Sequence, residues 1–269
     1  MPKPVICIGA ALVDELFYAT DPLLLRTTNN VHVKRSAGGV SRNIAHQLSL
    51  LGVPTQLITV IGTDADGVWL KHICEDAGIK LDASLTVPGT GKYTGIINDD
   101  GSLFTALLSN ALVHLITPQY LTVHKSLLST ASYLLVDANL IPETIEWLIE
   151  FSNESGIPLI IEPVSVPPAK KLAHINLKGL YLITPNEDEL PAICNSSATT
   201  TEEQIKELLE RGVQNIWLHK GAEGSAFYSD GTYVTLHAPE AKVVDCTGAG
   251  DGSVTGYLLG KFLGKNEAD

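Results

Sequence analysis

A glycine-rich segment near the C-terminus carries the residues best suited to chemistry. It reads VVDCTGAGDG over residues 243–252, and we expect an apolar helix to follow over residues 253–262. Glycine lets the main chain come close to a ligand, and consecutive N–H groups can converge on an anion. The positive end of a following helix strengthens such a site. The segment therefore predicts a site for a phosphate or for a phosphoryl group in transfer.

Asp251 lies at the edge of this predicted anion site. A carboxylate repels a phosphate, but it belongs there if it takes a proton from an attacking hydroxyl group as a general base. One alternative is a tight strand-to-helix turn in which Asp251 only caps the helix. A nicotinamide site is another, although glycines at 248, 250 and 252 lack the GxGxxG spacing.

A second candidate segment reads SAGGVSRNIA over residues 36–45. The adjacent Gly38 and Gly39 precede an expected helix that carries Asn43 in its first turns. A polyol can approach the main chain at the two glycines, and an asparagine side chain both donates and accepts hydrogen bonds with hydroxyl groups. The segment predicts a site for a hydroxyl-bearing ligand, with a plain turn into a helix as the structural alternative.

Expected strands and helices alternate along most of the chain. Short apolar runs typical of buried strands occupy residues 5–9, 56–61, 132–136, 158–162, 180–184 and 215–219. Helical spacing occurs at residues 37–51, 67–77, 118–128, 142–154 and 200–211. This alternation predicts an α/β fold whose parallel sheet is covered by helices on both faces.

Two segments, at about residues 15–36 and 86–108, interrupt the alternation because neither contains a long helix. The second reads as a hairpin that turns at Asp99, Asp100 and Gly101. We expect both to contribute to a small β-sheet that projects from a single domain spanning residues 1–269.

Composition narrows the class of partner. The chain has 269 residues, of which 45% are apolar, enough for one large domain. A net charge of -12 disfavours nucleic acid and anionic lipid as partners. The sequence contains no run of about 18 apolar residues, so we expect no membrane-spanning helix. The four cysteines, Cys7, Cys74, Cys194 and Cys246, form no CxxC pair. Free thiols fit a reducing compartment, so the cytoplasm is the expected location.

Together, these segments resemble the ribokinase-like (PfkB) family of carbohydrate kinases. That family carries a GG…N segment near its N-terminus and a D-[TS]-[TN]-G-A-G-D segment near its C-terminus. Further matches follow in the family's order: Gly9–Asp14, the N-x-x-E pair Asn186 and Glu189, and the glycine turn Lys220–Gly224. The resemblance covers essentially the whole chain. It implies a three-layer α/β/α sandwich with a mostly parallel central sheet and a small β-sheet lid.

The same resemblance implies in-line transfer of the ATP γ-phosphoryl group to a primary hydroxyl. Asp251 would be the base, and the N–H groups of Gly248, Ala249 and Gly250 would hold the developing negative charge. The implied substrate-binding residues are Asp14, Gly38, Gly39, Asn43, Tyr93, Thr94 and Asn139. The implied nucleotide-binding residues are Asn186, Lys220, Gly221, Gly224 and Thr247. Mg²⁺ would bind near Glu189 through water, and the main chain around Asp245 is a candidate for K⁺.

The surroundings of the motifs resemble the pseudouridine kinase branch of the family at residues 31–45, 92–95, 136–140 and 162–165. The acceptor would then be the 5′-hydroxyl of pseudouridine. Ribose, fructose and a keto-deoxy acid are alternatives, and the last calls for a cation such as Lys34, Arg35 or Arg42.

A different class of function is a non-catalytic, ligand-binding relative. Only 18 residues follow Asp251, where the family usually has several more elements that complete the adenine side. We therefore expect weak ATP binding by a chain of this length. Members of the family often form dimers through the lid, so a homodimer is the expected assembly.

Overall fold

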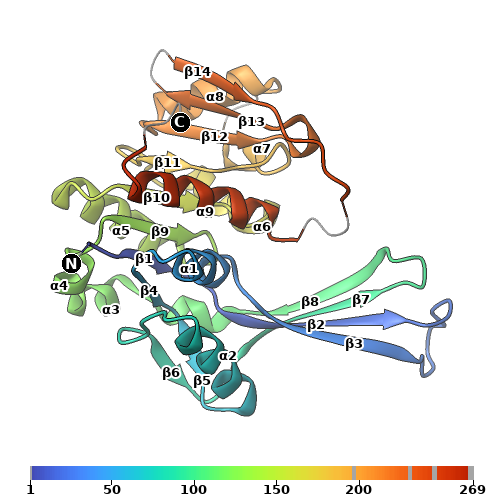
Figure 1. Ribbon diagram of the computed structural model, residues 1–269. Coiled ribbons are helices and arrows are strands. Elements are labelled where there is room, and N and C mark those ends of the chain that lie inside the picture. The colour runs from blue at the N-terminus through green and yellow to red at the C-terminus, as the bar shows by residue number, and fades with distance from the viewer. Residues whose placement is uncertain (1, 196–197, 230–231, 244–246, 266–269) are drawn as a thin grey trace.

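An eight-stranded sheet lies at the centre of the described part of the chain (Figure 1). The computed structural model describes residues 2–195, 198–229, 232–243 and 247–265. In spatial order the strands are β14 (Thr232–Leu236), β13 (Ser225–Ser229), β12 (Asn215–His219), β11 (Leu182–Ile183), β10 (Leu159–Glu162), β9 (Tyr133–Asp137), β1 (Val5–Ile8) and β4 (Thr55–Ile58). From β4 to β12 the neighbours are parallel, and β13 and β14 add antiparallel pairs at one edge. The mostly parallel sheet predicted from the sequence is thus confirmed.

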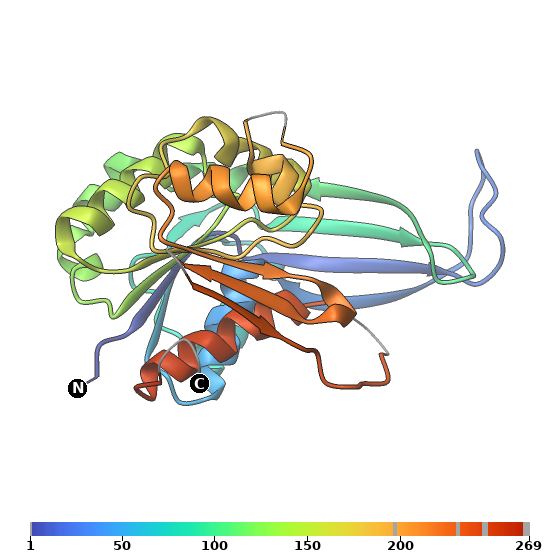
Figure 2. The same cartoon turned by 90° about the horizontal axis from the view of Figure 1, so that it is seen from above.

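Helices cover both faces of this sheet, as Figure 2 shows from above. One face carries α1 (Val40–Leu50), α2 (Ala65–Asp76) and α9 (Ala249–Phe262). The other carries α3 (Pro118–Val123), α4 (Lys125–Leu128), α5 (Pro142–Ser155), α6 (Val166–Ala169), α7 (Leu190–Ile193) and α8 (Thr201–Glu210). Short 3₁₀ turns are η1 (Ala111–Leu115), η2 (Lys170–His174) and η3 (Gly221–Glu223).

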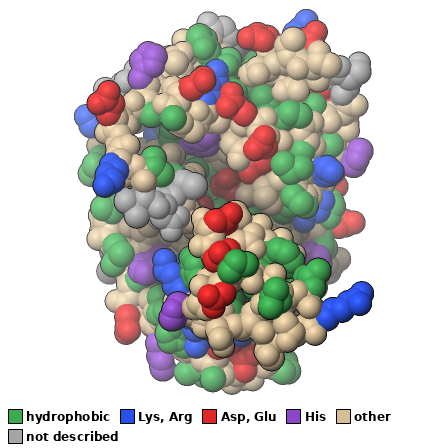
Figure 3. Space-filling view, turned by 90° about the vertical axis from the view of Figure 1, so that its right-hand side faces the viewer, with side chains coloured by type: hydrophobic (Ala, Val, Ile, Leu, Met, Phe, Trp, Pro, Cys, Tyr) green, Lys and Arg blue, Asp and Glu red, His purple; other side chains and the backbone are tan. Residues whose placement is uncertain are grey.

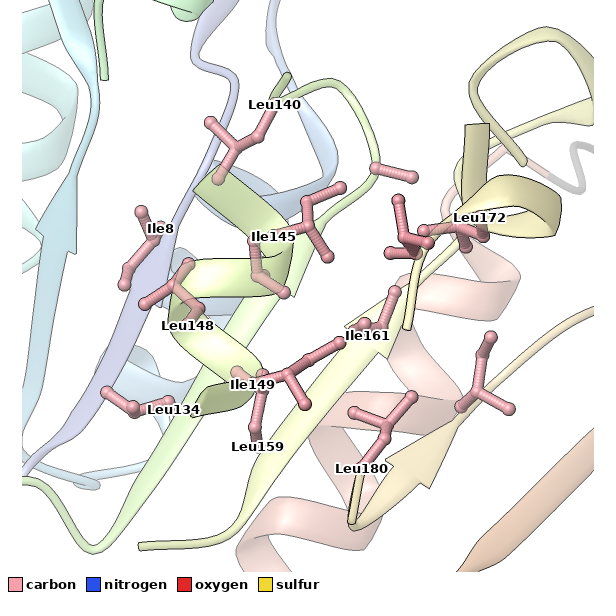
Figure 4. Packing of buried hydrophobic residues seen from close by; sticks show 14 of the residues in the cluster. Ile8, Leu134, Leu140, Ile145, Leu148, Ile149, Leu159, Ile161, Leu172 and Leu180 are labelled. Atoms are coloured by element: carbon pink, nitrogen blue, oxygen red, sulfur yellow. The ribbon is translucent and has the colours of Figure 1, made fainter. Parts of the chain in front are cut away.

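Side chains of the buried strands alternate between the two helical layers. In β1, Val5 and Cys7 pack toward α1 and α9, whereas Ile6 and Ile8 pack toward α5. Figure 4 shows the second layer, where isoleucines and leucines of α5 interdigitate with those of β1, β9 and β10. Each fully buried side chain of this kind contributes about 1.5–3 kcal/mol. This core fixes the sheet whose strand ends carry the site.

A second, four-stranded sheet projects from the body, and we call it the lid (Figure 1). Its order is β3 (Val31–Gly38), β2 (Leu12–Ala19), β7 (Gly91–Ile97) and β8 (Leu103–Ser109). A tight turn joins β7 to β8, with Gly101 at φ 86° and the Asp100 carboxylate accepting the N–H of Ser102 at 2.8 Å. The two segments that interrupt the strand–helix alternation, at about residues 15–36 and 86–108, therefore form one sheet, in which β2 pairs with β7.

Several boundaries differ from the sequence prediction. The helix expected from residue 37 begins at Val40, because residues up to Gly38 belong to lid strand β3. The strand expected over residues 56–61 is divided into β4 and β5 (Val60–Gly62), and β5 pairs with β6 (Leu85–Val87) in a separate small sheet. The β13–β14 hairpin was not predicted.

Candidate active site

A cleft of about 1160 Å³ lies between the lid and the carboxyl ends of the parallel strands. Its walls come from the lid, the first turns of α1 and α9, and the loops that follow β9 to β12. Open α/β sheets bind ligands at this edge, and a pocket for one small ligand has a volume of roughly 300–1,000 Å³. The cleft is larger than such a pocket and can therefore hold more than one small ligand. Figure 3 shows the hollow end-on, with acidic side chains beside it.

The helix α9 begins inside this cleft. Gly248 is its N-cap in the left-handed conformation, at φ 76°, and the N–H of Gly252 already donates to the Gly248 carbonyl at 2.8 Å. The expected start at residue 253 is thus wrong, because the glycine turn itself forms the first helical turn. Asp251 lies within that turn, and the first N–H groups of a helix are free to bind an anion.

Asp251 contacts the second candidate segment directly. Its side chain is buried, with 7% of the residue exposed, and Oδ2 accepts a hydrogen bond of 2.7 Å from Nδ2 of Asn43. Burial raises the pKa of Asp251, while the bond from Asn43 and the charge of Arg42 oppose that rise. The structure therefore joins two motifs that the sequence could only treat separately.

Arg42 lies behind this pair and was expected only as a possible cation for an acidic substrate. It is buried, and its guanidinium donates to the carbonyl oxygens of Ala37 at 2.6 Å and Gly38 at 3.3 Å. It also donates to Nδ1 of His46 at 2.9 Å and to Oδ1 of Asn43. Arg35 is engaged as well, with Asp66. Of the three suggested cations, Lys34 lines the cleft.

Alternate residues of the lid face the cleft. From β2 these are Leu12, Asp14, Leu16 and Tyr18. Tyr93, the neighbour of Asp14 across the sheet, also lines the cleft. Thr94 follows Tyr93 in the same strand and does not line it, because successive strand residues point to opposite faces. The expected placement of Thr94 toward the substrate is therefore corrected.

Asp14 is set close to the main chain of the second segment. Burial raises the pKa of Asp14 to about 6, against the charge of Arg42. A Cβ atom at Gly38 would collide with the Asp14 carboxylate, and a Cβ at Gly39 would collide with the carbonyl oxygen of Ala10. Gly38 thus supports Asp14 without lining the cleft, whereas Gly39 lines it. Both glycines are needed for this close approach.

Asp137, at the end of β9, connects three loops of the site. Its fully buried carboxylate accepts the N–H groups of Ala10 at 2.8 Å, Ser41 at 3.2 Å and Asn139 at 3.1 Å. Since Gly39 has no side chain with which to cap α1, Asp137 supplies an acceptor to its first turn from another strand. Asn139, a predicted substrate-binding residue, lines the cleft.

Two glutamates lie at the other end of the cleft. Glu189 forms a reciprocal pair with Asn186: Oδ1 of Asn186 accepts the N–H of Glu189 at 2.9 Å, and Oε2 of Glu189 accepts that of Asn186 at 3.0 Å. Glu162, which ends β10, belongs to the segment 162–165 that carried part of the resemblance, but it was not predicted as a site residue. Burial and then the charge of Glu189 raise its pKa well above the ordinary value. An acid at the last position of an expected strand was the signal that could have found it.

Carboxylate oxygens of this kind are suitable ligands for Mg²⁺, which usually takes one or two carboxylates and fills its other positions with water and substrate phosphates. Within the described ranges, no group of three or more potential metal-ligating side chains occurs. Glu162 and Glu189 therefore fit a cation held jointly with a phosphate-bearing ligand better than a closed protein cage.

The remaining candidates lie along the far wall. Gly221, Gly224, Thr247 and Asn186 line the cleft, whereas Lys220 does not. Gly224, at φ 99°, packs against the main chain after β14, where a Cβ would collide with the carbonyl oxygen of Leu236. Asp245 and Cys246 lie outside the described residues.

The fold and this cleft define a small-molecule phosphotransferase. The family described as pfkB family carbohydrate kinase matches residues 3–268, and the chain belongs to that family. Among the curated relatives, pseudouridine kinase of Escherichia coli is 28% identical over 94% of this chain and 82% of its own length. An uncharacterized sugar kinase of Escherichia coli, YeiI, is 34% identical over 85% of this chain, which spans 64% of YeiI.

Solved structures agree on the fold. A carbohydrate kinase from Agrobacterium tumefaciens superposes with a TM-score of 0.85 at 27% identity, covering 98% of this chain and 86% of its own. Ribokinase of Arabidopsis thaliana, solved with ribose and ATP, gives a TM-score of 0.84 at 22% identity, covering 100% of this chain and 88% of its own. The ribokinase-like three-layer sandwich is thereby confirmed. No helix in the described part of the chain is long and apolar enough to cross a membrane.

Proposed function

We propose that this carbohydrate kinase transfers the γ-phosphoryl group of ATP to the 5′-hydroxyl of pseudouridine. The observation that carries the chemistry is the buried Asp251 in the first turn of α9, hydrogen-bonded to Asn43 at 2.7 Å inside a cleft that can hold more than one small ligand. The similarity to Escherichia coli pseudouridine kinase supports the choice of nucleoside.

In this reaction Asp251 accepts the proton of the attacking hydroxyl. The raised pKa of Asp251 brings its basicity closer to the operating pH than that of an ordinary aspartate. The N–H groups of Gly248, Ala249 and Gly250, at the positive end of α9, stabilise negative charge on the group in transfer. Positioning and electrostatics of this kind supply most of the acceleration in phosphoryl transfer.

The acceptor lies on the lid side of the cleft. Asp14, Gly39, Asn43 and Asn139 offer hydrogen-bonding groups to the hydroxyls of a ribose, and the Tyr93 ring offers a surface for the base. Thr94 is left out because it lies on the other face of the lid. The closed lid would exclude water, a competing acceptor of the phosphoryl group.

ATP occupies the opposite side, bounded by Asn186, Gly221, Gly224 and Thr247. Lys220 supports the glycine turn through its N–H, which donates to the Gly224 carbonyl at 2.8 Å. Mg²⁺, when bound near Glu189 and Glu162, neutralises charge on the phosphates. Burial and then the charge of Glu189 raise the pKa of Glu162, and a cation between the two carboxylates would offset both effects.

Other expectations remain part of the same proposal. Residues 1–269 form one kinase unit with the lid as an insertion, and a homodimer forms through the lid, whose outer face exposes 57% of Val33 and 64% of Leu107. A cytoplasmic location is supported by the free thiols of Cys7, Cys74 and Cys194. K⁺ near Asp245 is a prediction outside the described residues.

A second candidate is kinase activity on another sugar or on a keto-deoxy acid. Lys34 carries this alternative, because its side chain lines the cleft and could pair with a substrate carboxylate.

The test is an assay of ADP release from Mg-ATP with pseudouridine, uridine, ribose, fructose and keto-deoxygluconate. We expect turnover on pseudouridine, and a loss of about a hundredfold or more in Asp251→Asn. Asp188→Asn is the matched control, since Asp188 is exposed beside Glu189. Turnover on another compound of the panel would keep the kinase activity and identify that compound, in place of pseudouridine, as the substrate. No turnover by a folded sample on any compound would overturn the kinase assignment for this chain and favour a non-catalytic, ligand-binding relative.

A further inference from the structure

The side chain of Asn43 can face Asp251 in two ways. Its amide carries a donor nitrogen at one end and an acceptor oxygen at the other. The nitrogen faces Asp251, at 2.7 Å from Oδ2. The opposite orientation would set two oxygens against each other and would favour a protonated Asp251. Asp251 can act as a base only when its carboxylate is ionised, so the orientation of Asn43 matters for the reaction.

Arg42 touches the other end of the same amide. Its guanidinium carries donors and no acceptor, and it donates to Oδ1 of Asn43. A donor at this position can bond to the amide oxygen but not to the amide nitrogen, which is itself a donor. The orientation of Asn43 is therefore decided from the side away from the substrate.

The guanidinium of Arg42 is itself held in place. Nη2 and Nε donate to the carbonyl oxygens of Ala37 at 2.6 Å and Gly38 at 3.3 Å, and Nη1 donates to Nδ1 of His46 at 2.9 Å. Only 5% of the residue is exposed. This fixation ties the orientation of Asn43 to the end of β3, the strand that also passes beside Asp14.

We propose that Arg42 is a positioning residue that holds the Asn43 amide with its nitrogen toward Asp251. This role rests on the proposed function of Asp251 as the base. Arg42 acts through Asn43 and touches neither the nucleoside nor the nucleotide in this scheme. A glutamine at residue 42 would lack the charge and the rigid fork, and would leave Asn43 free to turn.

Loss of Arg42 should therefore change the protonation of Asp251. Several ionisable groups act on these two residues. Asp251 is affected by Arg42 of α1 and by Asp137 of β9, and it acts in turn on Glu162 of β10. The groups that act on Arg42 are Asp14 of β2, Cys74 of α2 and Asp251 of α9, and His46 of α1 is bonded to it. Because both Arg42 and the Asn43 bond lower the pKa of Asp251, their loss raises it further.

The first measurement is kcat against pH, with saturating pseudouridine and Mg-ATP, for the wild type and Arg42→Gln. We expect its acidic limb to move up by about one pH unit, so that kcat falls by up to about tenfold on that limb and by less at higher pH. Arg211→Gln is the matched control. The Arg211 guanidinium also binds main-chain carbonyls, those of Ile193, Leu172 and Ile175, and Arg211 does not line the cleft. The acidic limb of the kcat–pH profile of Arg211→Gln should stay at the wild-type position.

The second measurement is a double-mutant cycle with Asn43→Ala. If Arg42 acts mainly through Asn43, Arg42→Gln should change kcat clearly less in the Asn43→Ala background than in the wild type, because only the direct effect of its charge on Asp251 remains there. Additive losses would overturn the proposal, as would a uniform loss at every pH with no movement of the limb. If Arg42→Gln does not fold, Arg42→Lys keeps the charge without the fork, and should give a smaller shift in the same direction.

A readout without turnover separates this role from the proposed function. In protein labelled with ¹³C at the aspartate carboxyl groups, the Asp251 signal is identified by its loss in Asp251→Asn, and its pKa is read by titration. A pKa that rises in Arg42→Gln, and rises clearly less when the same substitution is made in the Asn43→Ala background, supports the positioning role even if no compound of the panel is phosphorylated. An unchanged pKa overturns it even if the wild type is an active pseudouridine kinase.

Discussion

Asn43 and Asp251 are 208 residues apart in the chain, yet Nδ2 of Asn43 donates a hydrogen bond of 2.7 Å to Oδ2 of Asp251. The two helices that carry them, α1 and α9, lie on the same face of the sheet, and Oγ1 of Thr255 donates to Oε1 of Gln47 at 2.8 Å between them. The first turns of both helices open into one cleft. The geometry of the candidate base is therefore set by the packing of one helix against the other.

Asp14 should give substrate capture a pH dependence of its own. Burial raises the pKa of Asp14 to about 6, so the carboxylate that accepts hydroxyl hydrogen bonds is lost as the pH falls through that value. We expect kcat/KM for pseudouridine to fall below about pH 6, and the limb in Asp14→Asn to keep only the contribution of Asp251, with a loss of about tenfold or more at neutral pH. Steady-state kinetics across the pH range measures both effects.

Glu15→Gln provides the control for Asp14. Glu15 is the next residue of β2, does not line the cleft, and pairs with Nζ of Lys92 at 3.1 Å. Its substitution should leave the limb near pH 6 in place. A limb that is unchanged in Asp14→Asn would assign this titration to another group.

Tyr93 and Thr94 provide a matched pair for testing which lid face meets the nucleoside. Stacking of a base on an aromatic ring contributes about 1–3 kcal/mol, so Tyr93→Leu should raise KM for pseudouridine by about tenfold. Thr94→Val should change KM by less than about twofold, since Thr94 faces away from the cleft. Equal effects of the two substitutions on KM would show that the ring of Tyr93 does not contact the base.

Much of the fold could be predicted from the alternation of apolar runs and helical spacing. The runs at residues 5–9 and 158–162 are β1 and β10, and the pattern break near residues 86–108 contains the β7–β8 hairpin. The start of α9 was harder to predict. Glycine disfavours a helix by about 1 kcal/mol relative to alanine, so the GAG segment did not indicate one. Contacts from α1 to Asp251 and Thr255 stabilise this turn, and no local pattern contains them.

The site could be predicted as a set of motifs but not as a geometry. Period-two spacing shows that Tyr93 and Thr94 point apart, yet it does not say which of them meets the cleft. The position of Arg42 beside Asn43 gives no sign of which polar atoms the guanidinium meets. Glu162 reads as the end of an ordinary strand, and its proximity to Glu189 follows from the pairing of β10 with β11.

Glu162 should oppose folding when Mg²⁺ is absent. Its raised pKa means that stability is greatest while Glu162 is protonated and falls as the pH rises from the ordinary glutamate range through the raised value. Glu162→Gln removes this charge, and its side-chain oxygen can still accept the N–H of Val164, bonded at 2.7 Å. We expect the melting temperature at about pH 8 to rise by roughly 2–4 °C, equivalent to about 1 kcal/mol.

The gain in melting temperature of Glu162→Gln should shrink toward about pH 4.5, where a glutamate also protonates in the unfolded chain. Glu187→Gln is the control, because Glu187 is exposed in the loop before Glu189. Whereas the melting temperature should rise, the rate of ADP release at limiting Mg²⁺ should be lower in Glu162→Gln than in the wild type. A lower melting temperature at both pH values would mean that the carboxylate stabilises the apo fold, contrary to the cause assigned to its raised pKa.

Gly39 and Gly52 should separate backbone strain from steric collision. Both have positive φ, 95° and 81°, but a Cβ at Gly39 would collide with the carbonyl oxygen of Ala10, whereas a Cβ at Gly52 would meet nothing within 4 Å. Gly52→Ala should therefore cost only the left-handed conformation, about 1–2 kcal/mol. Gly39→Ala should cost more, about 3 kcal/mol or above, because the strand end and α1 must move apart. Urea unfolding measures both free energies. Equal losses would indicate that the chain between β3 and α1 relaxes freely, and would remove the steric reason for glycine at residue 39.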